Sequence, residues 1–125
     1  MKICINSRDE LRLIDMDSVV YLKASGNYSD FFYANGYVRT ELSCLSDFEQ
    51  LITSAFPAGT SPFIRLGRSL LVNIGYVASV NVNKQQLSFS VVPLSPVRLP
   101  RAVARDLKQF LSGKYEVGNS DIKAI

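Results

Sequence analysis

The chain has 125 residues, of which 47% are hydrophobic and 20% are charged, and a formal net charge of +3; this is the size and balance of one globular domain. The sequence contains no His, which excludes imidazole acid–base catalysis and His-based metal sites, and its glycines form no phosphate-binding motif. No apolar run approaches the ~20 residues of a membrane helix, and the first residues alternate instead of forming a signal peptide, so we expect a cytoplasmic protein without a cofactor, a bound metal or a membrane partner.

The first third of the chain predicts five strands joined by short turns. Alternating or β-branched runs indicate strands at residues 2–6, 11–14, 19–24, 28–34 and 37–42. Residues 7–10 and 15–18 have turn composition, and Ser25-Gly26-Asn27 interrupts an otherwise apolar stretch. Asn35-Gly36 predicts a two-residue hairpin turn.

The periodicity changes at residue 43, where apolar side chains begin to recur at helical spacing. We expect a helix over residues 43–56, capped by Ser43 or Ser46, and then a loop over residues 57–62. Further strands are expected at residues 63–66, 70–72, 76–82, 86–92 and 97–99. A second helix is predicted at residues 100–111, with Pro100 in its first turn and Ser112-Gly113 at its end.

These elements sum to a mainly β fold of mostly antiparallel strands with one inserted helix and one C-terminal helix. We expect a single domain over residues 1–114 and a flexible tail over residues 115–125. Cys4 and Cys44 form no CxxC pair and are expected to be buried free thiols in a reducing compartment, with a disulfide as the alternative.

The charges are unevenly distributed along the chain. Residues 1–49 hold five bases and eight acids, whereas residues 50–105 hold six bases and no acid. A segment in which all charged residues are basic predicts a basic face that could bind a polyanionic partner. The alternative is that folding scatters six bases of ordinary density over the surface.

Two turns could carry chemistry. Asn27 and Tyr28 stand at a tight break between strands, where Asn can bond an adenine edge and Tyr can reach a phosphate; an ordinary turn is the alternative. Arg65 and Arg68 flank Gly67 between two strands, an arrangement that can project a guanidinium toward guanine or phosphate, and Ser69 can add a phosphate contact. Here the alternative is an arginine pair that binds acids supplied by the fold.

A third basic segment lies at the entry to the last helix, where Arg98, Arg101 and Arg105 cluster. Arg101 and Arg105 are four residues apart and share a helix face. A helix N-terminus favours anions, so arginines there increase phosphate affinity. Solvated surface arginines, with Arg105 paired elsewhere, are the alternative.

The order VVYLKASGNYSDFFY, a helix, FIRLGRSLLVNIGYVASV, a hairpin and VRLPRAVARDLKQFL resembles the LytTR family of bacterial DNA-binding domains over about residues 2–114. The most specific part is FIRLGRSLLVNI, where the family typically shows F-x-R-x-H-R-S-x-L-V-N. The segment ASGNY matches a second family signature.

The resemblance implies an elongated, mainly β domain of the response-regulator type, not an enzyme, whose loops enter successive major grooves of promoter DNA to regulate transcription. It implies paired direct-repeat operators that bind two copies side by side, and it allows a partner signalling protein. Carried over by position, Asn27, Tyr28, Arg68 and Arg101 would contact DNA. Ser69 and Asn73 match residues that order the kink around Arg68.

Three residues depart from the family pattern. Gly67 stands where His is frequent, Lys23 where an acid is common, and Pro100 where Ser would cap the last helix. Family members often carry a receiver domain or a membrane segment, and neither is found in this chain. We expect a stand-alone regulator, because the sequence begins with Met1, with a fragment as the alternative.

Two functions other than DNA binding are compatible with this composition. A protein-interaction module could keep the fold, lose DNA binding and use exposed aromatic side chains at Phe31, Phe32, Tyr33 and Tyr37. An enzyme would need paired carboxylates such as Asp15 and Asp17, but turn formation explains these two residues better and no nucleophile with a base accompanies them.

Overall fold

The computed structural model describes residues 1–119, which form ten strands, two α-helices and two short 3-10 helices. The first half contains β1 (Lys2–Asn6), β2 (Leu11–Asp15), the 3-10 helix η1 (Met16–Ser18), β3 (Val19–Ser25), β4 (Tyr28–Tyr33), β5 (Val38–Glu41) and α1 (Leu45–Ala55). The second half contains β6 (Phe63–Leu66), β7 (Leu70–Asn73), the 3-10 helix η2 (Ile74–Tyr76), β8 (Val77–Asn81), β9 (Gln86–Phe89), β10 (Val97–Arg98) and α2 (Arg101–Lys114).

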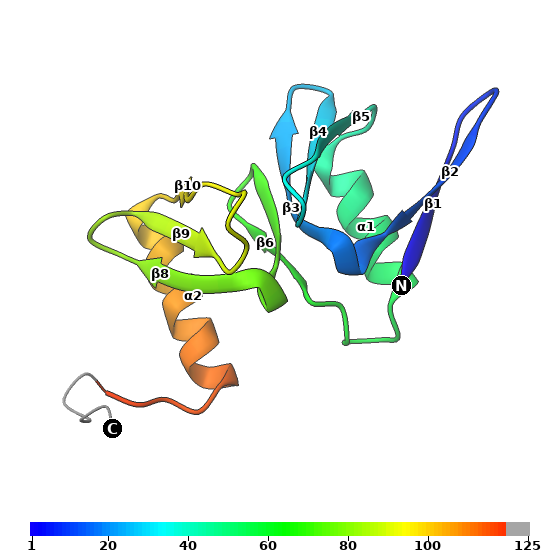
Figure 1. Ribbon diagram of the computed structural model, residues 1–125. Helices are drawn as coiled ribbons and strands as arrows, with labels where there is room; N and C mark the ends of the chain where they lie inside the picture. The colour runs from blue at the N-terminus through cyan, green and yellow to red at the C-terminus, as the bar shows by residue number, and fades with distance from the viewer. Residues whose placement is uncertain (120–125) are drawn as a thin grey trace.

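The strands form three antiparallel sheets, which confirms the mainly β fold with one inserted and one C-terminal helix. A central five-stranded sheet has the order β5-β4-β3-β7-β6, flanked by the hairpin β1–β2 and the three-stranded sheet β10-β9-β8. Figure 1 shows α1 and the β1–β2 hairpin on one side of the central sheet, and β8, β9, β10 and α2 on the other. The molecule is therefore layered, with the central sheet in the middle.

Both faces of the central sheet are buried, each in its own hydrophobic core. On β3, Val19 and Leu22 pack into the core under α1, whereas Val20 and Tyr21 pack into the core under α2. A register shift between Val19 and Tyr21 places two consecutive side chains on the same side of the sheet. Burial on both faces explains why the VVYL run is apolar without alternation.

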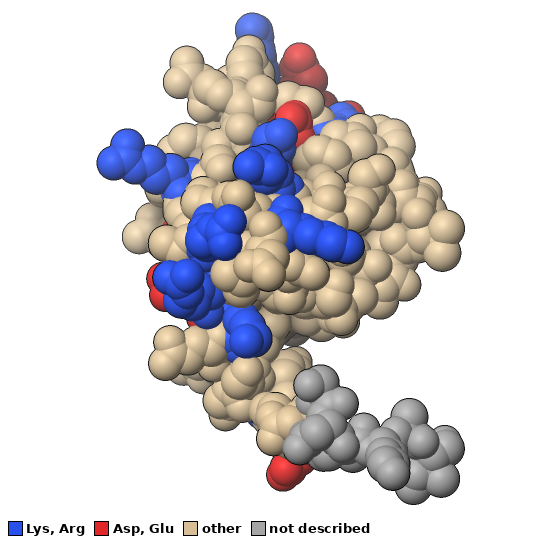
Figure 2. All heavy atoms as spheres, turned by 90° about the vertical axis from the view of Figure 1, so that its left-hand side faces the viewer, with Lys and Arg blue, Asp and Glu red and all other residues tan. Residues whose placement is uncertain are grey.

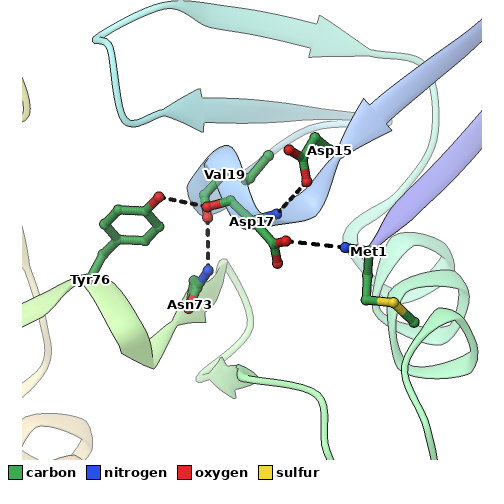
Figure 3. Close-up of polar contacts among 6 residues, drawn as sticks. All are labelled: Met1, Asp15, Asp17, Val19, Asn73 and Tyr76. Atoms are coloured by element: carbon green, nitrogen blue, oxygen red, sulfur yellow. Dashed lines mark hydrogen bonds and ion pairs between the residues drawn. The ribbon is translucent and has the colours of Figure 1, made fainter.

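Polar contacts cap the two 3-10 helices and join them to each other, since the Tyr76 hydroxyl of η2 donates to the Asp17 carbonyl of η1 at 2.6 Å (Figure 3). Asp15 accepts the amide of Asp17 at 3.1 Å and so caps η1, and Asn73 accepts the amide of Gly75 at 3.0 Å and caps η2. The Asn73 amide also donates to the Val19 carbonyl at 3.2 Å. These bonds explain why Asp15 ends β2 and Asn73 ends β7, since Asp and Asn side chains accept hydrogen bonds from backbone amides two residues on.

Replacing Asn73 by alanine is expected to destabilise the fold by about 1.5 kcal/mol, because Asn73 is buried and two backbone groups would lose their partner. Urea unfolding followed by circular dichroism measures this change. The control Asn6→Ala, at an exposed strand end, should change stability by less than ~0.5 kcal/mol. Equal stability of the two variants would contradict the assigned role of Asn73.

The two halves of the chain follow the same element order. The series β2-η1-β3-β4-β5-α1 is repeated as β7-η2-β8-β9-β10-α2. The repeat extends to detail, because β8 has a register shift between Val77 and Ser79 at the position that corresponds to the shift in β3. The sequence shows no such repeat, since the equivalent side chains differ.

The Asn35-Gly36 hairpin is present, but the turn has three residues and not the two predicted. Phe32 pairs with Val38, and the Tyr33 amide donates to the Tyr37 carbonyl at 2.9 Å, which leaves residues 34–36 in the turn. Gly36 has φ of +89°, and a Cβ there would lie 2.9 Å from the Pro93 side chain. Glycine is therefore required by both conformation and space.

The helix ends also differ from the predictions. Cys44 is the N-cap of α1 and gives no side-chain hydrogen bond, while the Ser43 hydroxyl donates to the Asp47 carboxylate at 2.9 Å; the expectation that Ser43 or Ser46 caps the helix was wrong. At the other end of the chain, α2 continues through Ser112-Gly113 to Lys114, and the Tyr115 amide still donates to the Leu111 carbonyl at 3.1 Å.

The two cysteines are free but exposed, so the expectation that they are buried was wrong. Cys4 lies between Ile3 and Ile5, whose side chains turn toward the core, and strand alternation therefore turns Cys4 outward. Cys44 precedes α1. Of the predicted tail, residues 115–119 follow α2 without regular structure, and residues 120–125 lie outside the described residues.

The aromatic side chains proposed for a protein-interaction surface are mostly not exposed. Phe31 is fully buried and packs edge-to-face on Phe48 with ring centroids 4.9 Å apart. Phe32 stacks on Tyr21 at 4.2 Å. Tyr33 is half-buried, which raises the pKa of its hydroxyl above the ordinary value, and the nearby Glu41 carboxylate raises it further. Tyr37 is exposed as expected.

A buried ion pair fastens the β1–β2 hairpin to the central sheet. The Arg12 guanidinium on β2 donates to the Glu41 carboxylate on β5, whose side chain is 5% exposed. Arg12 also contacts Glu10 at 2.8 Å, and the Glu41 carboxylate lies 3.6 Å from Arg39. The hydrogen bond to Glu41 raises the pKa of Arg12 despite partial burial.

Among residues 1–119, no helix is long and apolar enough to cross a membrane.

Candidate nucleic-acid interface

Two of the three predicted contact segments lie side by side at one end of the central sheet. Lys23 on β3 pairs with Leu70 on β7, and the Ala24 amide donates to the Ser69 carbonyl at 2.8 Å. The turn after β3 and the turn before β7 are therefore joined by backbone pairing. Ala24 and Ser69 are far apart in the sequence, and no local pattern predicts their pairing, because it depends on the order of strands in the sheet.

The β3–β4 turn presents Asn27 and Tyr28 at its tip. Ser25 pairs with Tyr28, which leaves Gly26 and Asn27 as a two-residue turn. Gly26 has φ of +61°, the left-handed conformation that such a turn requires. Asn27 is exposed, and the Tyr28 side chain is also exposed, so both are free to meet a ligand in front of this sheet end.

The β6–β7 turn presents Arg68 in a three-residue loop. Leu66 pairs with Leu70, which leaves Gly67, Arg68 and Ser69 exposed between the strands. Gly67 has φ of +62°, and a Cβ there would lie 3.9 Å from the Val103 side chain on α2. The loop therefore approaches the first turns of α2.

Arg65 has a different environment from Arg68. Its Nη1 lies 2.8 Å from the Glu49 carboxylate and 3.4 Å from the Ser46 hydroxyl on α1. Its Nη2 donates to the Arg68 carbonyl at 3.0 Å. The fold thus supplies an acid to Arg65, as in the alternative interpretation that the arginine pair binds acids. The Arg65 guanidinium also holds the backbone of the turn from which Arg68 projects.

The third segment forms a basic face next to these turns. We use this name for Lys84, Arg98, Arg101 and Arg105, which are exposed and, among residues 1–119, have no carboxylate within 4.0 Å. Figure 2 shows Lys and Arg side chains gathered on the side of the molecule formed by β8, β9, β10 and α2, with few acidic side chains among them. The excess of bases in the sequence therefore becomes a local surface feature.

The β8–β9 turn adds Lys84, a residue that the sequence motifs did not indicate. Leu99 donates its amide to the Gln85 carbonyl at 2.9 Å and accepts the Gln85 side-chain amide at 3.2 Å. Arg101 lies 3.5 Å from the Asn83 side chain. These contacts hold the turn against the entry to α2. The sequence feature that could have indicated Lys84 is its position within residues 50–105, which contain no acid.

The N-terminus of α2 is open toward this basic face. Pro100 occupies the N-cap and gives no side-chain hydrogen bond, which agrees with the loss of a serine cap expected from the sequence. Among residues 1–119, no side chain accepts a hydrogen bond from the first amides of α2, and such amides attract anions. Asp15 and Asp17, by contrast, serve the cap of η1, and Asp17 pairs with the Met1 amino group at 3.2 Å.

The comparisons with known proteins agree with this architecture. The model of the LytTr DNA-binding domain family matches residues 9–112. The chain is also similar to a solved structure, the LytTr DNA-binding domain of a methyl-accepting/DNA response regulator from Bacillus cereus, with a TM-score of 0.61 and 19% identity over 89% of this chain and 96% of that chain. No curated protein matches the sequence. Because the family match covers most of its length, the chain belongs to the LytTR family of DNA-binding domains.

Proposed function

We propose that this protein binds duplex promoter DNA sequence-specifically and regulates transcription, with the β3–β4 turn, the β6–β7 turn and the start of α2 as its contact points. The observation that carries this proposal is the joining of the two turns by the Ala24–Ser69 bond beside a basic face. Turns held this close together can enter the same groove side by side, and the basic face supplies the phosphate contacts that dominate affinity.

Base reading is assigned to the two turns. Arg68 is exposed and can bond guanine O6 and N7 with its planar fork. Asn27 can bond adenine bidentately, and Tyr28 can stack on a base or donate to a phosphate. Ser69 lies beside Arg68 and adds a hydroxyl for a phosphate oxygen.

Phosphate binding is assigned to Arg98, Arg101 and Arg105 and to the open amides of α2. Lys84 extends the same surface. Arg65 receives a changed role, because its bonds to Glu49 and the Arg68 carbonyl make it a positioning residue for the β6–β7 turn. In this proposal, Arg65 positions the β6–β7 turn and Arg68 contacts the bases.

The proposed assembly is two copies bound side by side on paired direct repeats in cytoplasmic DNA. Its support is membership of a DNA-binding family. A partner signalling protein would set the activity of the bound pair. The alternative of a protein-interaction module is weakened by the burial of Phe31 and the stacking of Phe32.

In vitro selection of duplexes from a random pool, followed by fluorescence anisotropy at several salt concentrations, tests the proposal. We expect enrichment of a discrete sequence, and a binding constant that falls with salt because phosphate neutralisation releases counterions. Failure to enrich any sequence would contradict sequence-specific binding.

Replacing Arg105 by alanine is expected to weaken binding to selected and unselected duplexes alike. Loss of one phosphate contact should reduce the slope of log affinity against log salt by about 0.9. Lys114→Ala, at the opposite end of α2, is the matched control and should leave the slope unchanged. An unchanged slope for Arg105→Ala would remove Arg105 from the phosphate-binding group.

A further inference from the structure

A groove of about 430 Å³ lies beside the proposed DNA-binding turns, between the central sheet and the β9–β10 loop. Its walls are the Pro93–Pro96 segment on one side and the ends of β3, β4 and β7 on the other, and the lining includes Tyr21, Lys23, Ser69 and Arg98. This volume falls in the usual range for sites that hold small molecules.

The groove combines apolar surface with hydrogen-bond donors and cations. Phe32 and Leu70 supply apolar surface, while Lys23 and Arg98 contribute two positive charges. Among the described residues, no acidic side chain lines the groove, and neither cation has a carboxylate within 4.0 Å. The nearest acid in register is Asp30, which pairs with Lys23 across the strands and accepts the Thr40 hydroxyl at 2.6 Å.

Tyr21 gives an independent indication of a ligand. Its side chain is 6% exposed and its ring lies between Phe32 and Phe89, with centroid distances of 4.2 and 5.1 Å. Within residues 1–119, no group forms a hydrogen bond with its hydroxyl, and Tyr21 lines the groove. Burial raises the pKa of this hydroxyl, and Asp30 raises it further, so the group remains a donor at neutral pH.

Lys23 and Arg98 both line this groove, and together they make it attractive to an anion.

We propose that this groove binds a small organic anion with a flat apolar body, such as an aromatic carboxylate or sulfonate, and that its occupation opposes DNA binding. The acidic group would meet Lys23, Arg98 and the Tyr21 hydroxyl, and the apolar body would lie against Phe32 and Leu70. Ser69 and Arg98 belong both to the groove and to the proposed DNA surface. The anion and the duplex therefore cannot contact these two residues at the same time. The competition rests on the proposed DNA-binding function, but the binding of the anion does not.

The first experiment is a fluorescence titration of the full chain, without DNA, with 8-anilinonaphthalene-1-sulfonate. We expect saturable binding that weakens about tenfold in Lys23→Glu, since the charge is reversed, and about threefold in Tyr21→Phe, since one hydrogen bond is lost. Thermal unfolding verifies that both variants fold. Tyr21→Phe keeps the stacked ring and removes a hydroxyl without a protein partner, so its stability should match that of the parent.

Two controls make the result specific. Lys108→Glu makes the same charge reversal at a second groove between β8 and α2, and it should leave the affinity unchanged. N-phenyl-1-naphthylamine, the same probe without its sulfonate, should bind the parent and Lys23→Glu equally. The proposal is overturned if Lys23→Glu has no effect, if Lys108→Glu has the larger effect, or if the uncharged probe shows the same dependence on Lys23.

The second experiment adds the selected duplex to the protein saturated with the sulfonate probe. Release of the probe by the duplex, and a weaker apparent affinity for DNA in its presence, are expected. Probe binding without competition would overturn the antagonism and leave the ligand site intact. A protein that binds the probe but selects no duplex would overturn the proposed DNA-binding function separately.

Discussion

Replacing Arg68 by alanine is expected to weaken binding to the selected duplex by ~2 kcal/mol, about 30-fold, while leaving stability unchanged. Arg68 is exposed in the β6–β7 turn, and among the described residues no carboxylate lies within 4.0 Å of its guanidinium. The loss should therefore come from the lost bidentate contact to guanine and not from the fold. Anisotropy titrations with the selected duplex and with a scrambled duplex measure the specific and non-specific parts.

The matched control for this prediction is Arg8→Ala. Arg8 is likewise an exposed arginine in a strand-connecting turn, but it lies in the β1–β2 connection, on the other side of the central sheet from α2. Its removal lowers the net charge by the same amount without touching the proposed interface. A similar loss of affinity in both variants would mean that Arg68 contributes long-range charge alone, and the base-reading role would be wrong.

Replacing Arg12 by alanine should destabilise the protein by about 3 kcal/mol, because it leaves the buried Glu41 carboxylate without its main partner. The magnitude lies at the low end for buried ion pairs, since the Arg12 side chain is 21% exposed. Arg39 lies 3.6 Å from the Glu41 carboxylate, which is beyond hydrogen-bond length. Denaturant unfolding at neutral pH measures the effect.

Two further variants distinguish pairing from packing at this position. Arg39→Ala removes a more exposed partner and should cost less than ~1 kcal/mol. The double variant Arg12→Met/Glu41→Leu removes both charges and should be more stable than Arg12→Ala, because no buried charge remains. Equal destabilisation in Arg12→Ala and Arg39→Ala would show that the ion pair does not fasten the hairpin.

The pH dependence of this contribution follows from the direction of the pKa shift. Glu41 raises the pKa of Arg12, so the folded state holds this proton more tightly than the unfolded chain does. Its contribution is complete below the unfolded pKa of arginine and is lost as pH rises through the folded pKa. Across the neutral range, Arg12 therefore contributes a constant amount.

Much of the local structure could be predicted from the sequence, because it depends on short-range patterns. Alternation located β1, and a β-rich apolar run located β3, whose burial on both faces became clear only from the structure. The breaks at Gly26 and Gly67 were turns, as expected, because both glycines have positive φ. Helix boundaries were less accurate, since capping at Cys44 and continuation through Gly113 depend on contacts and not on residue type alone.

Family membership and the acid-free basic segment were also properties of the sequence by itself. Tertiary structure decided which bases are available, because Glu49 from α1 reaches Arg65 and leaves Arg68 exposed. It also joined the β3–β4 and β6–β7 turns through Ala24 and Ser69, and it buried Phe31. The physical reason is the same in each case: a side chain's partners are fixed by strand order and sheet packing, which bring together residues that no local pattern connects.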